Sequence, residues 1–105
     1  MVIIARNWRK PEGEIDLIAV DSDRTCVFCE VRSRTGESAG DPLETVNARK
    51  QARVARAARL YLSQTDPPPP LAAAYRFDVI AVTFFEDQRD PRVVHVASAF
   101  DVPGG

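Results

Sequence analysis

Residues 13–34, GEIDLIAVDSDRTCVFCEVRSR, decide the fold of this chain. Two runs rich in apolar and β-branched side chains, residues 14–20 and 25–34, flank the polar tetrapeptide DSDR at residues 21–24. Such runs separated by a short polar turn are typical of a β-hairpin. The sequence therefore predicts two antiparallel strands joined by a tight loop.

The two faces of this hairpin differ in character. Successive side chains of a strand point to opposite faces of the sheet. One face is wholly apolar and is expected to be buried, with Ile15, Leu17, Ala19, Val27, Cys29 and Val31. The other face is apolar near the turn and charged at its far end, with Glu14, Asp16, Glu30 and Arg32. We therefore take the charged end as the candidate functional site.

A hairpin register centred on Asp23 places Asp16 opposite Glu30 and Glu14 opposite Arg32. Opposed residues have Cβ atoms roughly 4.5–5.5 Å apart, where like charges are destabilising. Two carboxylates at this distance repel by on the order of 3–4 kcal/mol at an effective dielectric near 20. A divalent cation reverses that cost, because carboxylate oxygens suit Mg²⁺ or Mn²⁺. We predict a metal site on Asp16 and Glu30, supported by Glu14. The alternative is a rim of exposed salt bridges.

The rest of the chain predicts three more strands and one helix. Residues 2–8, 75–84 and 93–102 have the composition of strands. A helix is expected from an N-cap at Thr45 to about residue 64, because the prolines at residues 67–70 stop it. This order favours an α/β fold in one domain over residues 1–105. It has a mixed sheet of about five strands with one main helix packed on it.

The expected helix has one basic side. On a helical wheel Arg49, Arg53 and Arg56 fall within about 60° of one another. Lys50 and Arg59 flank them. Gln51 lies in the centre of the apolar side, where its amide could hold a carboxylate, a water or a phosphate. The residues expected to contact a nucleic-acid backbone are Arg34, Arg49, Lys50, Arg53 and Arg56. The alternatives are an ordinary solvated face and an ordinary Gln51 that reaches solvent.

Composition sets outer limits on function. The chain has 105 residues, 45% hydrophobic and 28% charged, with a net charge of −1. That charge excludes nucleic-acid binding by a uniformly basic surface. Cys26 and Cys29 are three apart in a strand, so they point to opposite faces and are expected to be small buried hydrophobes. His95 is expected to be structural. No apolar run approaches about 18 residues, and no signal peptide is visible, so a cytoplasmic protein without membrane partners is expected.

Four segments in this order identify a family resemblance: GEIDLIA at residues 13–19, VFCEVRSR at 27–34, RKQ at 49–51 and YRFDVI at 75–80. The chain resembles the YraN family of bacterial proteins. That family is similar to the archaeal Holliday-junction resolvases and to the PD-(D/E)XK, or restriction-endonuclease-like, superfamily. The resemblance covers about residues 4–82 and implies a restriction-endonuclease-like core.

The resemblance also implies roles for individual residues. Asp16 matches the metal-binding aspartate and Glu30 the glutamate of the E-x-K element. Arg32 stands where lysine is usual, and arginine cannot serve as a base. Gln51 matches a glutamine that often follows on the helix. A helix that usually precedes the strand at residues 2–8 has no counterpart in this sequence.

The resulting hypothesis is a metal-dependent nuclease-type domain that hydrolyses phosphodiester bonds in DNA. Asp16 and Glu30 would hold the metal, Arg32 would clamp the phosphate, and Gln51 would orient the water or the backbone. A branched substrate and a homodimer follow from the resemblance alone. Two alternatives stay open: a degenerate nuclease fold that only binds nucleic acid, and a protein-interaction module that uses exposed strand edges.

Overall fold

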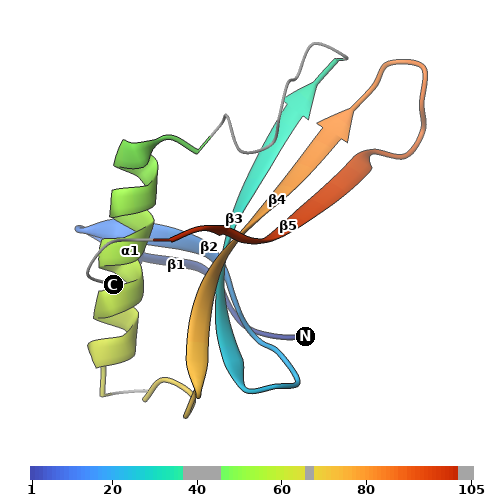
Figure 1. Ribbon diagram of the computed structural model, residues 1–105. Helices are drawn as coiled ribbons and strands as arrows, with labels where there is room; N and C mark the ends of the chain where they lie inside the picture. The colour runs from blue at the N-terminus through green and yellow to red at the C-terminus, as the bar shows by residue number, and fades with distance from the viewer. Residues whose placement is uncertain (37–45, 66–67, 102–105) are drawn as a thin grey trace.

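A computed structural model of the chain describes residues 1–36, 46–65 and 68–101. Within these residues one helix packs against a five-stranded sheet whose strands follow the order of the sequence (Figure 1). The strands are β1 (Val2–Lys10), β2 (Gly13–Val20), β3 (Thr25–Thr35), β4 (Ala74–Phe84) and β5 (Arg92–Phe100). The helix α1 (Ala48–Ser63) lies between β3 and β4. The predicted α/β class and the order of elements are confirmed.

The bounds of the elements differ from the prediction by one or two residues, including the start of α1 and the end of β5. Thr45 lies outside the described residues, and α1 begins after Asn47, whose side-chain oxygen accepts the amide of Lys50 at 3.0 Å. An asparagine in extended conformation satisfies an otherwise unpaired amide of the first turn, which makes it a favourable N-cap. The predicted N-cap at Thr45 therefore placed the start of the helix two residues too early. The last strand ends at Phe100, and Val102 lies outside the described residues.

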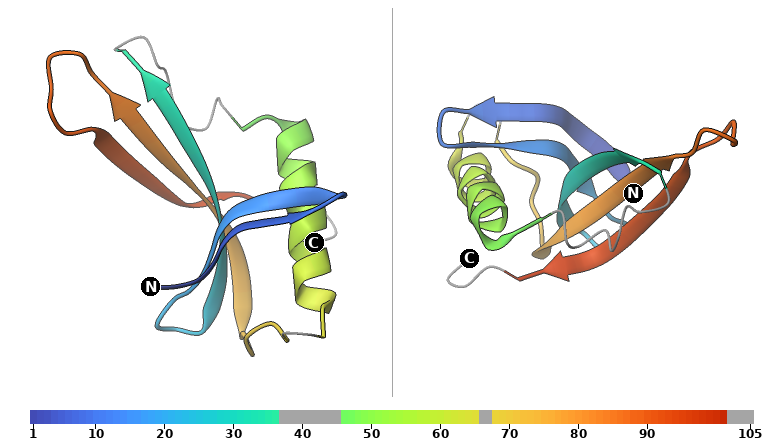
Figure 2. Two further views of the ribbon diagram at one scale, coloured as in Figure 1. Left: turned by 180° about the vertical axis from the view of Figure 1, so that it is seen from behind. Right: turned by 90° about the horizontal axis from the view of Figure 1, so that it is seen from above.

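The sheet is mixed. β1 and β2 are antiparallel, β2 and β3 are antiparallel, β3 and β4 are parallel, and β4 and β5 are antiparallel. Parallel neighbours need a crossover connection, and α1 is part of that connection. In all three views the turn joining β1 to β2 lies beside α1 (Figures 1 and 2). The C-terminal ends of β3 and β4 and the N-terminal end of β5 extend away from the helix (Figure 1).

The predicted register of the hairpin is confirmed by the pairs Ile18 with Phe28 and Val20 with Cys26. The predicted faces are only partly right. Phe28 and Ile18 lie in the core beneath α1, and Ile15 joins them there. Leu17 and Ala19 belong to a second apolar cluster with Val27 and Cys29 on the other face. Ile15 was expected to share their face, so the strict alternation is interrupted at Asp16 and Leu17.

The core beneath α1 consists of small helix residues and aromatic strand residues. Val54, Ala57, Ala58 and Tyr61 of α1 form the helix side of this core. The ring of Tyr61 meets those of Trp8 and Phe28 edge-on, with centroids 5.6 Å and 6.1 Å apart. Alanines allow the helix to approach the sheet closely, while the rings fill the space at its end. The helix therefore packs its apolar side against the sheet.

A buried carboxylate organises the face of the sheet away from the helix. Asp78 is 0% exposed. Its oxygens accept the Ser98 amide at 2.9 Å and the Arg76 Nε at 3.1 Å, and His95 Nε2 lies 2.7 Å away. The register of β4 with β5 shifts between Phe77 and Val79. Asp78 therefore anchors an irregular stretch of β5, which accords with a structural role for His95.

Gly13 sets the distance between β2 and the helix. A Cβ added at Gly13 would lie 2.7 Å from the backbone oxygen of Arg53 and 3.3 Å from Ala57 Cβ. Backbone cannot yield as a side chain can, so we expect Gly13→Ala to push α1 off the sheet and lower the free energy of unfolding by about 1–3 kcal/mol. Urea denaturation measures this. Glu12→Ala, in the adjoining exposed turn, is the control and should change stability by less than about 0.5 kcal/mol. An unchanged Gly13→Ala protein would contradict the close approach.

Candidate carboxylate site

Glu30 is a buried carboxylate on the helix side of β3. It is 5% exposed and follows Phe28 by two residues, so both side chains point toward α1. Its Oε1 atom lies 3.1 Å from the Lys50 Nζ of α1 and 3.7 Å from an Arg32 guanidinium nitrogen. Burying a carboxylate is costly unless it is paired. The helix therefore brings a lysine to the acid at the end of the core.

Asp16 comes close to Glu30 because its carboxylate takes the place of a main-chain oxygen as the acceptor of the Val31 amide. Its Oδ2 accepts the amide of Val31 at 2.8 Å. Continued pairing would give that amide a partner at Ile15, but the paired register ends at Leu17 with Cys29. The expected direct pairs of Asp16 with Glu30 and of Glu14 with Arg32 are therefore not formed in the ladder. Asp16 instead lies in the plane of the sheet, beside the peptide that follows Glu30.

The electrostatics of Glu30 show that the two acids interact. Burial raises the pKa of the Glu30 carboxyl above its ordinary value, and the charge of Asp16 raises it further. Lys50 and Arg32 oppose this rise. The charge of Asp16 thus disfavours the ionisation of Glu30, and the two cations partly compensate. An added cation between the acids would act in the same direction as Lys50.

A cavity of about 40 Å³ opens at Glu30, lined also by Glu14, Lys50, Arg53 and Val54. A water molecule needs roughly 10–15 Å³ measured in this way, so the cavity has room for water beside the carboxylate. Glu14 lines this space while forming an exposed ion pair with Arg9 at 3.2 Å. The strand pairing does not extend to the expected pair of Glu14 with Arg32. Glu14 and Glu30 line the same cavity, and a supporting role of Glu14 for a metal stays a prediction.

Only some of the other residues predicted to contact a ligand lie close to Glu30. Gln51 donates its Nε2 to the Val46 carbonyl at 3.0 Å, so its amide closes the start of the helix. Arg34 donates its Nε to the Thr83 hydroxyl at 3.3 Å, farther along β3. Arg53 lines the cavity. Arg49 and Arg56 are exposed on the outer side of α1.

Lys50 was expected only as a phosphate contact, and its pairing with Glu30 was missed. The signal was present in the helical spacing. Lys50 precedes Val54 by four residues and Ala57 by seven, so it continues the stripe that faces the sheet. Arg92 was also missed. It pairs with Thr83 across β5 and β4, which aligns it with Arg34, and its isolated position at the start of a strand gave no sequence signal.

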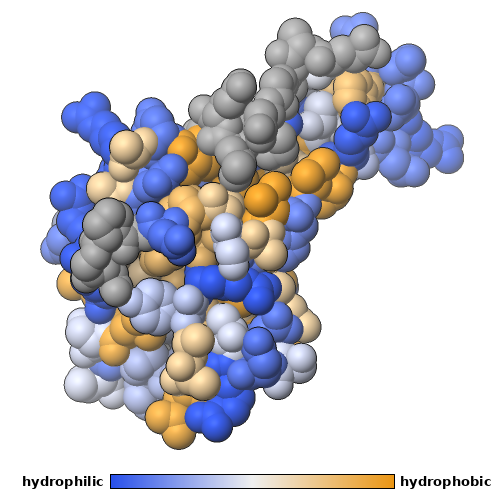
Figure 3. Space-filling view, viewed as in Figure 1, coloured by the Kyte–Doolittle hydropathy of each residue, from blue (hydrophilic) through white to orange (hydrophobic). Residues whose placement is uncertain are grey.

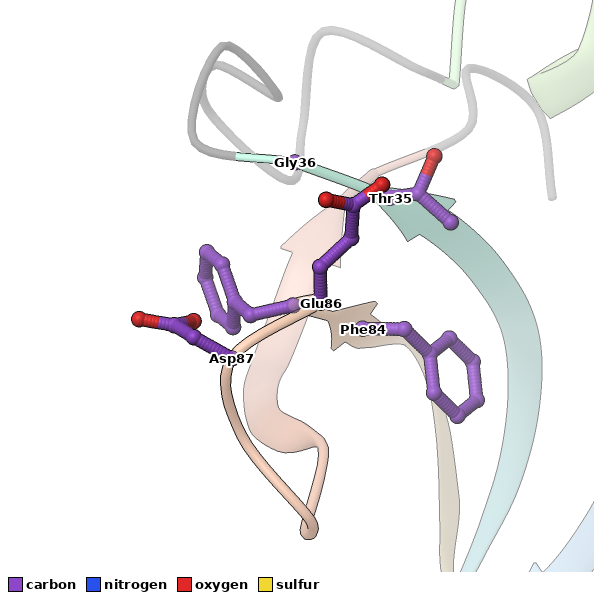
Figure 4. A pocket seen from close by; sticks show the side chains of 6 residues that line it. Thr35, Gly36, Phe84, Glu86 and Asp87 are labelled. Carbon is purple, nitrogen blue, oxygen red and sulfur yellow. The ribbon is translucent and has the colours of Figure 1, made fainter.

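Two larger open pockets lie away from Asp16 and Glu30. One of about 620 Å³ is at the outer ends of β3 and β4, where Glu86 extends toward Thr35 while Phe84 and Asp87 point to opposite sides (Figure 4). The other, of about 630 Å³, lies against residues 69–75 and Leu62. Neither pocket includes Asp16, Glu30 or Lys50 in its lining. The small cavity at Glu30 therefore carries the candidate chemistry.

Cys26 and Cys29 are free and buried, one in each apolar cluster, as predicted. Burial raises the pKa of the Cys26 thiol to about 11 and that of Cys29 to about 12. Reactive cysteines need accessible thiolates. These two are therefore packing residues.

Comparison with known families assigns this chain to one of them. The model of the uncharacterised protein family UPF0102 matches residues 1–82. The chain belongs to the UPF0102 family. A UPF0102 protein of Parafrankia sp. is 45% identical over 98 residues, which cover 93% of this chain and 79% of the relative. Another, from Syntrophotalea carbinolica, is 43% identical over 106 residues, covering 99% of this chain and 80% of the relative.

Membership of UPF0102 confirms the family expected from the sequence segments around Asp16 and Glu30. The match includes both carboxylates, Arg32 and Lys50, because it spans residues 1–82. In the described part of this UPF0102 chain, no helix is long and apolar enough to cross a membrane.

The raised pKa of Glu30 predicts a specific pH dependence of stability. A carboxyl whose folded pKa is raised holds its proton longer in the folded state, so its contribution to stability is lost as pH rises through the folded value. Glu30→Gln removes this titration. We expect the free energy of unfolding of Glu30→Gln, relative to wild type, to increase between pH 4 and pH 7.

Urea denaturation across this pH range measures the effect. Glu86→Gln, in the exposed β4–β5 turn, controls for the loss of one carboxylate. A relative stability of Glu30→Gln that stays flat or falls as pH rises would contradict the electrostatic description of the site.

Proposed function

We propose that this UPF0102 protein is a metal-dependent nuclease-type domain that binds DNA and hydrolyses its phosphodiester bonds. The observation that carries the proposal is the buried Glu30 carboxylate, held beside Asp16 and within 3.7 Å of two cationic side chains. The proposal includes a relationship to the PD-(D/E)XK superfamily and to the Holliday-junction resolvases. It also includes branched DNA as the substrate.

Stability alone is a poor explanation for this arrangement. Replacing a buried ion pair by apolar residues is often neutral or stabilising. Here the pair is extended to two acids whose charges oppose each other at the edge of the core. A carboxyl whose pKa is raised by burial and by a neighbouring charge, beside a cavity, is typical of functional sites. A phosphate-cleaving site gives each of these groups a use.

The donor set fits Mg²⁺ or Mn²⁺ when a substrate phosphate is present. Among the described residues, no group of three or more His, Cys, Asp or Glu side chains is arranged to hold a metal. Magnesium is commonly held by one or two carboxylates together with waters and substrate phosphates. Asp16 and Glu30 would supply the carboxylates, and the cavity lined by Glu14 has room for water. When bound, the ion would supply Lewis-acid polarisation of the scissile phosphate and acidify a water.

Lys50 and Arg32 divide the work that a single lysine performs in the E-x-K pattern. Arg32 keeps its charge and offers planar donors suited to a phosphate, so it would stabilise the negative charge of the transition state. Lys50 carries the amine that β3 lacks at position 32, and its Nζ already lies 3.1 Å from Glu30. We infer that Lys50 orients the attacking water beside Glu30. Gln51 would act only by fixing the start of the helix that carries Lys50.

DNA cleavage by site variants tests the proposal. We expect wild type to cut branched or single-stranded DNA with Mg²⁺ or Mn²⁺, and Asp16→Asn and Glu30→Gln to lower the rate at least about 10²-fold. Lys50→Ala should lower kcat by about 10²–10⁴-fold, with Lys50→Arg restoring binding but not rate. Lys10→Ala is the matched control, since Lys10 lies over the Trp8 ring at 5.7 Å, outside the site.

The outcomes separate the candidates. DNA that is bound but stays intact under all of these metal conditions favours the binding-only fold, which Arg32 in place of lysine also suggests. Equal loss of rate in Lys10→Ala and Lys50→Ala would remove the assigned role of Lys50. A wild-type protein that neither binds nor cuts DNA would leave the protein-interaction module, for which the exposed apolar residues Val2, Ile3 and Ile4 of the edge strand β1 offer a surface.

Calorimetry with Mn²⁺ tests the metal site independently of turnover. Because the proposed metal site offers only the carboxylates of Asp16 and Glu30, we expect weak binding by the protein alone and tighter binding when a non-cleavable phosphorothioate DNA is present. Asp16→Asn should abolish the tight component. Asp23→Asn, in the exposed β2–β3 turn, should retain it. Tight Mn²⁺ binding that survives Asp16→Asn would place the metal elsewhere.

A further inference from the structure

We propose that the helix-side face of the projecting arm binds the sugar–phosphate backbone of a DNA strand and leads it to the carboxylate site. The projecting arm comprises residues 30–35 of β3, 79–84 of β4 and 92–96 of β5. This inference rests on the proposed function and adds a surface, formed by Arg32, Arg34 and Arg92, that extends beyond the basic residues of the helix.

The register places the three arginines on one face. Arg32 and Arg34 follow Glu30 at alternate positions of β3, so they point to the same side as Glu30. Arg34 pairs with Thr83 of β4, and Thr83 pairs with Arg92 of β5. Paired residues of neighbouring strands share a face. Arg34, Thr83 and Arg92 therefore form a row across the arm, outside Glu30.

The spacing of this surface suits successive phosphates. Alternate residues of a strand are about 6.6 Å apart, and strands separated by one neighbour are roughly 10 Å apart. The guanidinium of Arg34 is oriented by its bond to the Thr83 hydroxyl at 3.3 Å. That of Arg92 lies over the Phe85 ring, 5.3 Å from its centroid. The side chains of Thr83 and Phe85 thus hold the two cations in place.

The charge of the arm has a direction. The strand residues that share this face outside Glu30 contain no acid: Arg32, Arg34, Val79, Ala81, Thr83, Arg92, Val94 and Val96. The β4–β5 turn at the outer end carries three acids, Glu86, Asp87 and Asp90, and one base, Arg89, so it is acidic on balance. The outer end of the arm is accordingly hydrophilic in Figure 3. A polyanion would be attracted along the arginine row and repelled at the turn.

The same residues indicate which part of the DNA is recognised. Binding of bases from single strands relies on aromatic stacking platforms. Between its arginines the helix-side face of the arm presents valine, alanine and threonine, and the nearby Phe85 ring is in contact with the Arg92 guanidinium. Arginine on such a surface contacts phosphate and fixes the position of the strand without reading its sequence. We therefore expect salt-dependent binding that tolerates changes in base sequence.

Charge reversal on the arm tests the inference. Arg34→Glu and Arg92→Glu should each weaken binding of a fluorescent DNA at least about 10-fold and reduce the slope of log K against log salt by about one. Arg6→Glu is the matched control, because Arg6 is exposed and pairs with Leu17 of the opposite face. Arg34→Gln and Arg92→Gln guard against misfolding, and circular dichroism checks every variant.

Cleavage kinetics distinguish the arm from the site. The arm variants should raise KM and leave kcat within about threefold of wild type, whereas Glu30→Gln lowers kcat. If Arg6→Glu weakens binding as much as the arm variants do, or the arm variants bind like wild type, the arm surface is wrong while the proposed function stands. If wild type shows no DNA binding at low salt, the proposed function and the arm surface both fail.

Discussion

The bond from the Val31 amide to the Asp16 carboxylate determines how the sheet divides. It replaces a main-chain acceptor with a side chain at the point where the β2–β3 pairing ends. Beyond that point β2 turns with β1 toward α1, while β3 continues beside β4 as a projecting arm (Figure 1). An ordinary ladder would have kept Asp16 out of the sheet plane. The separation of the strands therefore places a second acid beside Glu30 and opens the space that Lys50 enters.

Much of this arrangement could be predicted because it is local. The alternation of apolar residues on either side of Asp23 defined the hairpin and its register, and the charged end of one face defined Asp16, Glu30 and Arg32 as a group. The position of Ile15 could not be predicted, because its change of face follows from a tertiary hydrogen bond made by its neighbour. The N-cap was misplaced because Thr45 and Asn47 are both suitable caps.

The pairing of Lys50 with Glu30 illustrates a different limit. Its helical spacing with Val54 and Ala57 was visible, but charge alone favoured an outward orientation beside the neighbouring arginines. Lysine can bury its methylene chain along an apolar surface and present its amine at the edge. The buried Glu30 carboxylate reverses the usual preference, since it needs a cation that the core can accommodate. Contacts between distant segments decide such cases, as they also do for Arg34, Thr83 and Arg92.

A comparison of the two buried acids separates structure from function. Asp78 is bound by the Ser98 amide, by Arg76 and by His95, each at 3.1 Å or less at its shortest contact, and the two partners from β5, Ser98 and His95, fix that strand against β4. Glu30 is bound by the tips of Lys50 and Arg32, two long side chains that remain about 29% and 30% exposed. Such cations can rearrange toward an incoming phosphate without unfolding a strand. One buried carboxylate, Asp78, thus has fixed partners that hold two strands together, whereas Glu30, beside a cavity with room for water, has partners that it can exchange.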